Sequence, residues 1–256
     1  MMPILALHGF TGRGSDFAPF AEMSGVPDWH CPDLPGHGPD PQLDCSSDAT
    51  LRFVHETAAT VCTEQATSPR VLLGYSMGAR AGVLHAVNYP DYWDALILVS
   101  GNPGIEDPAV RTDRVKADDA LAQSLERMGV VGFLDFWQET PLIRGQKNIP
   151  SAWRETMLRN RQDHTVEGLA SSLRQFGQGS FPNLWPKVGN LSMPVCLITG
   201  AKDTKYTEIA ARMVGHLPHA HSRHTIIETA SHMPHLEQAE TTAEVVREFL
   251  SHRICR

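Results

Sequence analysis

Short apolar runs recur along the chain, and each predicts a β-strand. Most are rich in Val, Ile and Leu with little polar alternation, which is the pattern of strands buried on both faces of a sheet. The runs are Ile4 to Leu7, Val71 to Leu73, Ala95 to Val99, Val195 to Thr199 and His224 to Ile227, with a shorter strand near Trp29 to Cys31. Because segments with helical character separate them, the sequence predicts an α/β fold: a mostly parallel sheet with helices on both faces.

Helical spacing of apolar residues marks several segments between and after these strands. We expect a helix with one buried face around residues 51–62, a second helix after residue 78, and a third that closes the chain. The residues behind these predictions are Leu51, Val54, Ala58, Val61 and Cys62, the run Ala79 to Tyr89, and Val245, Val246, Phe249 and Leu250.

The pattern changes between Gly104 and Asn190, where strand-like runs disappear. Helical stretches such as Asp113 to Met128 and Ala152 to Asn160 take their place. We therefore predict a core made of residues 1–103 and 191–256, with residues 104–190 forming a helical cap inserted over the sheet.

Composition and charge exclude several classes of protein. The chain has 256 residues, enough for one large core, and its net charge is −7 with no basic tract, so we expect no nucleic acid partner. The cap carries eleven Lys and Arg against eleven Asp and Glu, so the core holds the whole negative charge and the cap is less repulsive to an anionic ligand. No apolar run approaches about 18 residues, so no membrane span is expected.

The N-terminus and the cysteines favour a cytoplasmic location. Residues 1–8 lack the charged and long apolar regions of a signal peptide. The scattered cysteines include no C-x-x-C pair, which fits reduced thiols better than a disulfide framework or a zinc site. They are Cys31, Cys45, Cys62, Cys196 and Cys255. The histidine-rich stretch His216 to His224 fits no standard zinc spacing, and no dinucleotide or P-loop motif appears, so we expect neither metal nor cofactor.

The most informative motif is G-x-S-x-G at residues 74–78. It joins the apolar run ending at Leu73 to the helical stretch that starts at Ala79, so Ser76 lies at the apex of a sharp strand-to-helix turn. The neighbouring glycines let strand and helix approach without collision, and the helix N-terminus offers N–H donors to a developing anion. The motif predicts a nucleophile elbow with Ser76 as the reactive hydroxyl.

A reactive serine needs a base, and the base needs an acid that orients it. In this architecture the partners follow later strands in the order Ser, Asp, His. Asp203 and His232 each come shortly after a predicted strand, at the sheet edge where open α/β folds place their sites. Asp203 could instead cap a loop, and His235 is a rival for the base.

Two backbone donors are expected to hold an oxyanion. The elbow supplies the N–H of Met77, and the loop after the first strand supplies that of Phe10, just past His8-Gly9. The alternative for His8-Gly9 is an ordinary tight turn.

Taken together, these motifs resemble the α/β-hydrolase fold superfamily over nearly the whole chain. They are His8-Gly9-Phe10, Asp33-Leu34-Pro35-Gly36-His37-Gly38, Gly74-Tyr75-Ser76-Met77-Gly78, Gly200-x-x-Asp203 and Ser231-His232. The chain begins at what would be the third strand of that fold, which implies that the first hairpin is missing.

More narrowly, the chain resembles the 2-succinyl-6-hydroxy-2,4-cyclohexadiene-1-carboxylate synthases, lyases of menaquinone biosynthesis. The narrower resemblance rests on Tyr75 and Arg80, Arg111-x-x-Arg114-x-x-x-Asp118, Phe133-x-x-x-Trp137, Arg161 ahead of Glu167-Gly168-Leu169-Ala170, Gly177-x-Gly179-x-x-Pro182-x-x-Trp185, and the acid loop Gly200 to Tyr206. The G-x-S-x-G motif occurs throughout the superfamily, so the arginines are the residues that distinguish the synthases from its other members.

The resemblance implies a substrate with three carboxylates that loses pyruvate without the entry of water. It assigns substrate contacts to Tyr75, Arg80, Arg114, Trp137 and Arg161. A guanidinium matches a carboxylate bidentately, and Arg80 returns to the helix face of Ser76 one turn later. Two alternatives stay open: Arg159 could replace Arg161, and Arg114 could simply pair with Asp118.

In the mechanism that the resemblance implies, His232, oriented by Asp203, makes Ser76 a base for the ring proton beside the succinyl ketone. The N–H groups of Phe10 and Met77 hold the ketone oxygen, and no acyl-enzyme forms.

Two other functions remain open. One is a carboxylesterase or C–C bond hydrolase with Ser76 as nucleophile, and the other is a non-catalytic small-molecule receptor. The fold cannot separate these functions, but unpaired arginines would be costly in a site for apolar esters, which favours the lyase. The sequence predicts no oligomeric state.

Overall fold

A parallel sheet forms the centre of the protein, whose computed structural model describes residues 2–61 and 69–254. Within these residues the sheet has six strands in the order β2-β1-β3-β4-β5-β6, all parallel. The strands are β1 (Ile4–Leu7), β2 (Trp29–His30), β3 (Val71–Tyr75), β4 (Ala95–Val99), β5 (Val195–Gly200) and β6 (Arg223–Ile227). The α/β class and every predicted strand are confirmed, and the strand ends differ from the prediction by at most two residues.

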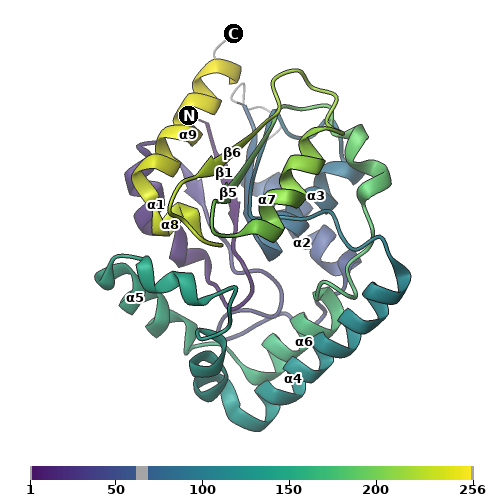
Figure 1. The fold of residues 1–256 in the computed structure, drawn as a ribbon, viewed down its shortest axis with the longest axis vertical. Coiled ribbons are helices and arrows are strands. Elements are labelled where there is room, and N and C mark those ends of the chain that lie inside the picture. The colour runs from purple at the N-terminus through teal and green to yellow at the C-terminus, as the bar shows by residue number, and fades with distance from the viewer. Residues whose placement is uncertain (1, 62–68, 255–256) are drawn as a thin grey trace.

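Helices cover both faces of the sheet, because successive strand residues point to opposite sides and both sides are apolar. One face, with Leu72 and Leu98, packs on α2 (Ser47–Val61), α3 (Met77–Asn88) and α7 (Thr204–Val214). The other, with Leu73 and Val99, packs on α1 (Ala18–Ser24), α8 (Pro234–Glu237) and α9 (Ala239–Ile254). Figure 1 shows α1, α8 and α9 together beside the sheet, opposite α2 and α3.

The predicted helices in the first and last thirds of the chain are confirmed. The helix expected around residues 51–62 is α2, and the one expected after residue 78 is α3. The closing helix is α9, in which Val246, Phe249 and Leu250 are buried. Cys62 and Cys255 lie outside the described residues.

The segment between β4 and β5 is helical, as its sequence predicts. It contains α4 (Pro108–Trp137), η2 (Arg144–Asn148), α5 (Ser151–Arg161), α6 (Val166–Phe176) and η3 (Trp185–Asn190), where η marks a 3₁₀ helix. Another 3₁₀ helix, η1 (Gly14–Phe17), follows β1. Figure 1 places α4 and α6 side by side below the sheet, with α5 at the other lower edge. Leu125 and Phe133 of α4 pack on Leu169 and Leu173 of α6 in a cluster of their own. We keep the division into core and cap as an interpretation of this arrangement.

Helix α4 is longer than the predicted stretch from Asp113 to Met128, and it is kinked. Gly129 has a φ of 69°, so two helical halves meet there at an angle. This bend lets both the first half and the last residue, Trp137, reach one cavity under the cap.

Among the residues that the structure describes, no helix is both long and apolar enough to cross a membrane.

Candidate active site

Ser76 lies on a sharp turn between β3 and α3. Its φ and ψ are 51° and −105°, a conformation that L residues rarely adopt, and its N–H donates to Val99 O at 2.9 Å. A Cβ at Gly74 would collide with the backbone of Gly78 and Ala79, and a Cβ at Gly78 would collide with the backbone of Leu7. The glycines of the motif are therefore required by close backbone approach, as the sequence indicated.

The structure brings Ser76, Asp203 and His232 together, although 156 residues separate Ser76 from His232. Nδ1 of His232 lies 2.5 Å from Asp203 Oδ2, and Nε2 lies 3.0 Å from Ser76 Oγ. Because a carboxylate accepts, Nδ1 carries the proton and Nε2 is free to accept one from the serine. This is the geometry of an activated hydroxyl.

Other groups fix the His232 ring and its loop. The rings of Tyr206 and Tyr75 flank it, with centroids 4.6 Å and 5.5 Å away. Glu237 accepts hydrogen bonds from the backbone N–H groups of Ser231 and Met233, at 2.8 Å and 2.9 Å, and so holds the loop on both sides of the histidine. Sequence reasoning missed Glu237, whose only signal is an acid in the turn that follows His232.

His235, the rival base, lies away from the serine. Its ring packs between Phe17, Phe20 and Tyr75, and burial lowers its pKa to about 3. The structure therefore favours His232 as the partner of Ser76.

The loop after β1, which carries Phe10, lies against the serine. A Cβ at Gly9 would touch Tyr75 and approach Ser76, so this loop lies directly against the elbow. Within the described residues, neither Phe10 N nor Met77 N donates a hydrogen bond, and both residues line the cavity at Ser76. Two free donors at this place fit an oxyanion site.

His8 fixes the orientation of the Gly9–Phe10 peptide. Its Nε2 accepts from Leu34 N–H at 2.9 Å, so its Nδ1 carries the proton and donates to Gly9 O, also at 2.9 Å. Gly12 N–H donates to the same oxygen. In a planar trans peptide the N–H points opposite to the C=O, so pinning Gly9 O also aims the Phe10 N–H.

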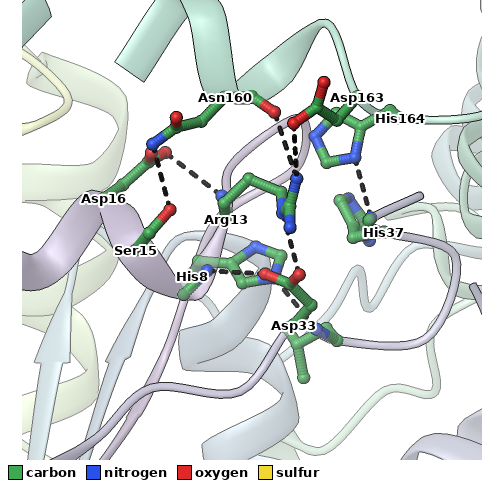
Figure 2. Close-up of polar contacts among 12 residues, drawn as sticks. His8, Arg13, Ser15, Asp16, Asp33, His37, Asn160, Asp163 and His164 are labelled. Carbon is green, nitrogen blue, oxygen red and sulfur yellow. Dashed lines mark hydrogen bonds and ion pairs between the residues drawn. The ribbon is translucent and has the colours of Figure 1, made fainter. Parts of the chain in front are cut away.

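A polar network ties this loop to the cap. Figure 2 shows Arg13 between Asp33 on one side and Asn160 and Asp163 on the other. Arg13 Nε donates to Asp33 at 2.8 Å, and Nη1 donates to the carbonyl of Asn160 at 3.1 Å. His164 completes the connection: its Nδ1 accepts from Gly38 N–H, so its Nε2 donates to Thr11 O.

We expect the free energy of unfolding to decrease as pH falls below about 6.5, because this network needs neutral histidines. Burial lowers the pKa of His8 and His164, and also that of His37, whose ring packs against both of theirs, to about 3. Between about pH 6.5 and pH 3 these histidines bind protons in the unfolded chain but not in the folded one. Their contribution to the free energy of unfolding is therefore fully present above about pH 6.5 and is lost as the pH falls towards 3. Each histidine should account for about 1 kcal/mol between pH 7 and 5.5, measured by urea denaturation.

Single variants test this origin of the pH dependence. His164→Gln removes one buried titrating ring, so its stability should change less with pH than that of the wild type. His216→Gln changes an exposed histidine and should keep the wild-type slope. An unchanged slope in His164→Gln would contradict the assignment.

A cavity opens above Ser76 between the sheet and the cap. It encloses about 570 Å³ of space, part of it open to solvent. Sequence-predicted residues that line it are Phe10, Tyr75, Ser76, Met77, Arg80, Arg114, Trp137 and His232. Lining residues that sequence reasoning did not single out include Leu142, Ser172, Phe176 and Gln178; they lie on the cap and lack a local signal.

Arg80 is the main cation of this cavity. Its side chain is 5% exposed, and its Nη2 donates to the carbonyl of Phe176 at 2.8 Å, while its buried Nε has no partner in the described chain. No carboxylate of the described residues forms an ion pair with it, and burial lowers its pKa to about 10. A buried guanidinium without a counter-ion is costly to maintain unless a ligand supplies the charge.

Arg114 and Trp137 reach the same cavity from opposite ends of α4. Arg114 Nε donates to Asp118 at 2.7 Å, so the pairing considered as an alternative is present, yet both residues line the cavity. Asp118 also accepts from Gly179 N–H, which holds the carboxylate in place. The indole Nε1 of Trp137 is buried without a partner in the part of the chain described, and is a free donor near the cavity.

The structure does not place Arg161 in the cavity lining. Its Nη1 donates to Gln146 at 3.0 Å and its Nη2 lies 3.5 Å from Asp16, with both charged side chains only 4% exposed. Arg161 is close enough to lower the pKa of Tyr75, against the larger effect of burial that raises it. Arg159 is exposed, donates to Thr156 and does not line the cavity either. A substrate contact at Arg161 stays a prediction.

In the part of the chain that the structure describes, no three His, Cys, Asp or Glu side chains are grouped closely enough to hold a metal ion.

The chain is similar to proteins of known class. A family model described as the alpha/beta hydrolase family matches residues 4–245. A Pectobacterium atrosepticum protein named 2-succinyl-6-hydroxy-2,4-cyclohexadiene-1-carboxylate synthase is 30% identical over 98% of this chain and 94% of its own. A Bacillus subtilis protein that carries the same name provisionally is 34% identical over 97% and 90%. The solved structure of MenH from S. aureus matches with a TM-score of 0.85 and 27% identity, covering 98% of this chain and 94% of that one.

Proposed function

The chain belongs to the alpha/beta hydrolase family and, within it, to the family of the 2-succinyl-6-hydroxy-2,4-cyclohexadiene-1-carboxylate synthases, and from this premise we propose that it is such a lyase. The reaction removes pyruvate from 2-succinyl-5-enolpyruvyl-6-hydroxy-3-cyclohexene-1-carboxylate. Fold and triad alone would serve a hydrolase equally well, so the choice depends on the rest of the site.

The observation that carries this proposal is the buried, unpaired guanidinium of Arg80 in the cavity of Ser76. An apolar ester would leave its charge uncompensated, whereas a carboxylate would pair with it bidentately. Arg114 lies across the same cavity and adds a second, partly neutralised cation. A polycarboxylate is the class of ligand that these charges fit.

The first step is removal of a carbon-bound proton. Ser76 Oγ, deprotonated by His232 Nε2 at 3.0 Å, takes the ring proton beside the succinyl ketone. The electron pair left on carbon moves onto the ketone oxygen, which we place against the N–H groups of Phe10 and Met77. Asp203 stabilises the imidazolium that forms.

The second step expels the leaving group. The enolate electrons return through the ring double bond, the ring C–O bond breaks, and enolpyruvate departs. Enolpyruvate takes a proton on carbon and becomes pyruvate, while the ring, which had one double bond in the substrate, now has two conjugated double bonds. Serine thus acts as a base, and no covalent intermediate is formed.

The test compares elimination with ester hydrolysis. Wild-type protein should release pyruvate from the enolpyruvyl substrate, followed by a coupled lactate dehydrogenase assay and by the ultraviolet absorbance of the diene. It should turn over a neutral p-nitrophenyl ester at least 10³-fold less efficiently, because such an ester leaves Arg80 unpaired. Rapid ester hydrolysis without pyruvate release would establish the hydrolase instead, and inactivity towards both would favour a receptor.

A further inference from the structure

We propose that Arg144 and Lys202 form a second carboxylate subsite beside the triad, which binds one carboxylate of the substrate outside the Ser76 cavity. The subsite lies in a separate cavity of about 690 Å³, part of it open to solvent. This inference rests on the proposed function, since it names where a further anionic group of the polycarboxylate binds.

The two cavities meet at the catalytic histidine. His232 and Leu142 line both of them, whereas Ser76 lines only the first and Asp203 only the second. A ligand held above Ser76 therefore lies next to the second cavity across a single imidazole ring and one leucine side chain. A carboxylate-bearing arm of the substrate that extends past these two groups would enter the second cavity.

The second cavity has a positive balance of charge. Within residues 2–61 and 69–254, the side chains of Arg144 and Lys202 form no ion pair and no hydrogen bond, and both are exposed. The acid in the lining, Asp203, is already bound to His232. Lys147, on the same short helix as Arg144, is instead paired with Glu139 at 2.8 Å. The two free cations are thus available to an anion.

The segment that carries Arg144 is fixed against the histidine loop. A Cβ at Gly145 would collide with the side chain of Ser231, so η2 lies directly on that loop. The side-chain amide of Gln146 donates a hydrogen bond to the sulfur of Met233, and its oxygen accepts one from Arg161. The backbone next to Arg144 is therefore held in place relative to His232, which reduces the conformational entropy lost when a ligand binds.

Two cations, Arg80 and Arg114, line the first cavity, whereas the proposed substrate carries three carboxylates. Among the described residues, Arg80 forms no ion pair, Arg114 shares its charge with Asp118, and Arg161 is held by Asp16 and Gln146 outside the lining. A substrate with three carboxylates would gain from another cationic site within reach, and the exposed pair beside His232 supplies it.

Arg144→Gln and Lys147→Gln form a matched test, because both remove one positive charge from the same short helix. Lys147 does not line the second cavity. In the pyruvate-release assay, KM should rise about fivefold in Arg144→Gln and at least tenfold in Arg144→Gln/Lys202→Gln, with the effect on KM exceeding that on kcat. Lys147→Gln should stay within twofold of wild type. Raising ionic strength should increase the wild-type KM and reduce the difference between wild type and double variant.

Equal KM values for the double variant, Lys147→Gln and wild type would overturn the subsite and leave the lyase assignment intact. The same cavity could instead hold the carboxylate of released pyruvate. Weaker inhibition by pyruvate in the double variant, with KM unchanged, would mean that the site serves the product, and this too would overturn the proposal.

A binding measurement separates this inference from the reaction itself. Succinate can be titrated calorimetrically into Arg80→Met protein, in which the unpaired cation of the first cavity is gone and only Arg114, paired with Asp118, remains there. Its affinity should fall at least fivefold when Arg144→Gln/Lys202→Gln is added. This result would support the subsite even if the wild type released no pyruvate, whereas unchanged affinity would remove it.

Discussion

Replacing Ser76 by alanine is expected to lower kcat for pyruvate release about 10³- to 10⁴-fold, the range for losing a positioned general base. The hydroxyl is the only part removed, and Ser76 N–H can still donate to Val99 O. Substrate binding should change little, because Arg80 and Arg114 are untouched, so KM should stay within about threefold. Steady-state kinetics with the coupled pyruvate assay measure both parameters.

Ser172→Ala is the matched control for this prediction. Ser172 lines the same cavity, and within the described residues its hydroxyl donates only to the sulfur of Met77, at 3.5 Å, so its loss should change kcat by less than threefold. The double variant Ser76→Ala/His232→Ala should be no slower than Ser76→Ala, because the two groups act as a unit. Additive losses in the double variant would indicate that His232 acts on substrate without the serine.

Arg80→Met is expected to reduce kcat/KM about 10²- to 10³-fold, which corresponds to losing a buried contact between two opposite charges. The same change should not lower the free energy of unfolding and should raise it by up to about 2 kcal/mol, because a buried cation without a carboxylate partner is replaced by an apolar chain of similar length. Kinetics and urea denaturation on one preparation give both results. Function and stability are therefore predicted to move in opposite directions.

Arg13→Met provides the contrast. Arg13 is paired with Asp33 and contacts the cap, so its loss leaves a carboxylate without its partner and should destabilise the protein by about 1 to 3 kcal/mol. Arg80→Lys keeps the charge but not the planar fork, and its kcat/KM should lie between those of wild type and Arg80→Met. If Arg80→Met lost stability as Arg13→Met does, Arg80 would be a structural residue and not a ligand contact.

The elbow and the order of the triad could be predicted because they depend on local geometry. Gly74 and Gly78 are imposed by the close approach of strand and helix, and Asp203 follows a strand with a clear apolar run, whereas His232 follows the more polar strand β6. The choice between His232 and His235 was open at that level, since both lie in the same loop region. Only packing separates them: one faces Ser76 and the other is enclosed by aromatic rings.

Contacts between distant segments left no such local signal. Arg161 meets Asp16, a residue in a different part of the chain, and nothing in either neighbourhood indicates the pair. Leu142 lines two cavities from a loop without periodicity. The full length of α4 was also missed, because Gly129 interrupts the apolar spacing that would have joined its two halves.

The central claim is that Ser76 removes a proton and that no water enters the products. The most direct test is to run the reaction in H₂¹⁸O and analyse the ring product by mass spectrometry. An elimination predicts a cyclohexadiene product of unchanged oxygen content, formed in equal amount to pyruvate. Ring or succinate fragments that carry one ¹⁸O atom from a single turnover would show that the serine serves a hydrolase, and would contradict the lyase.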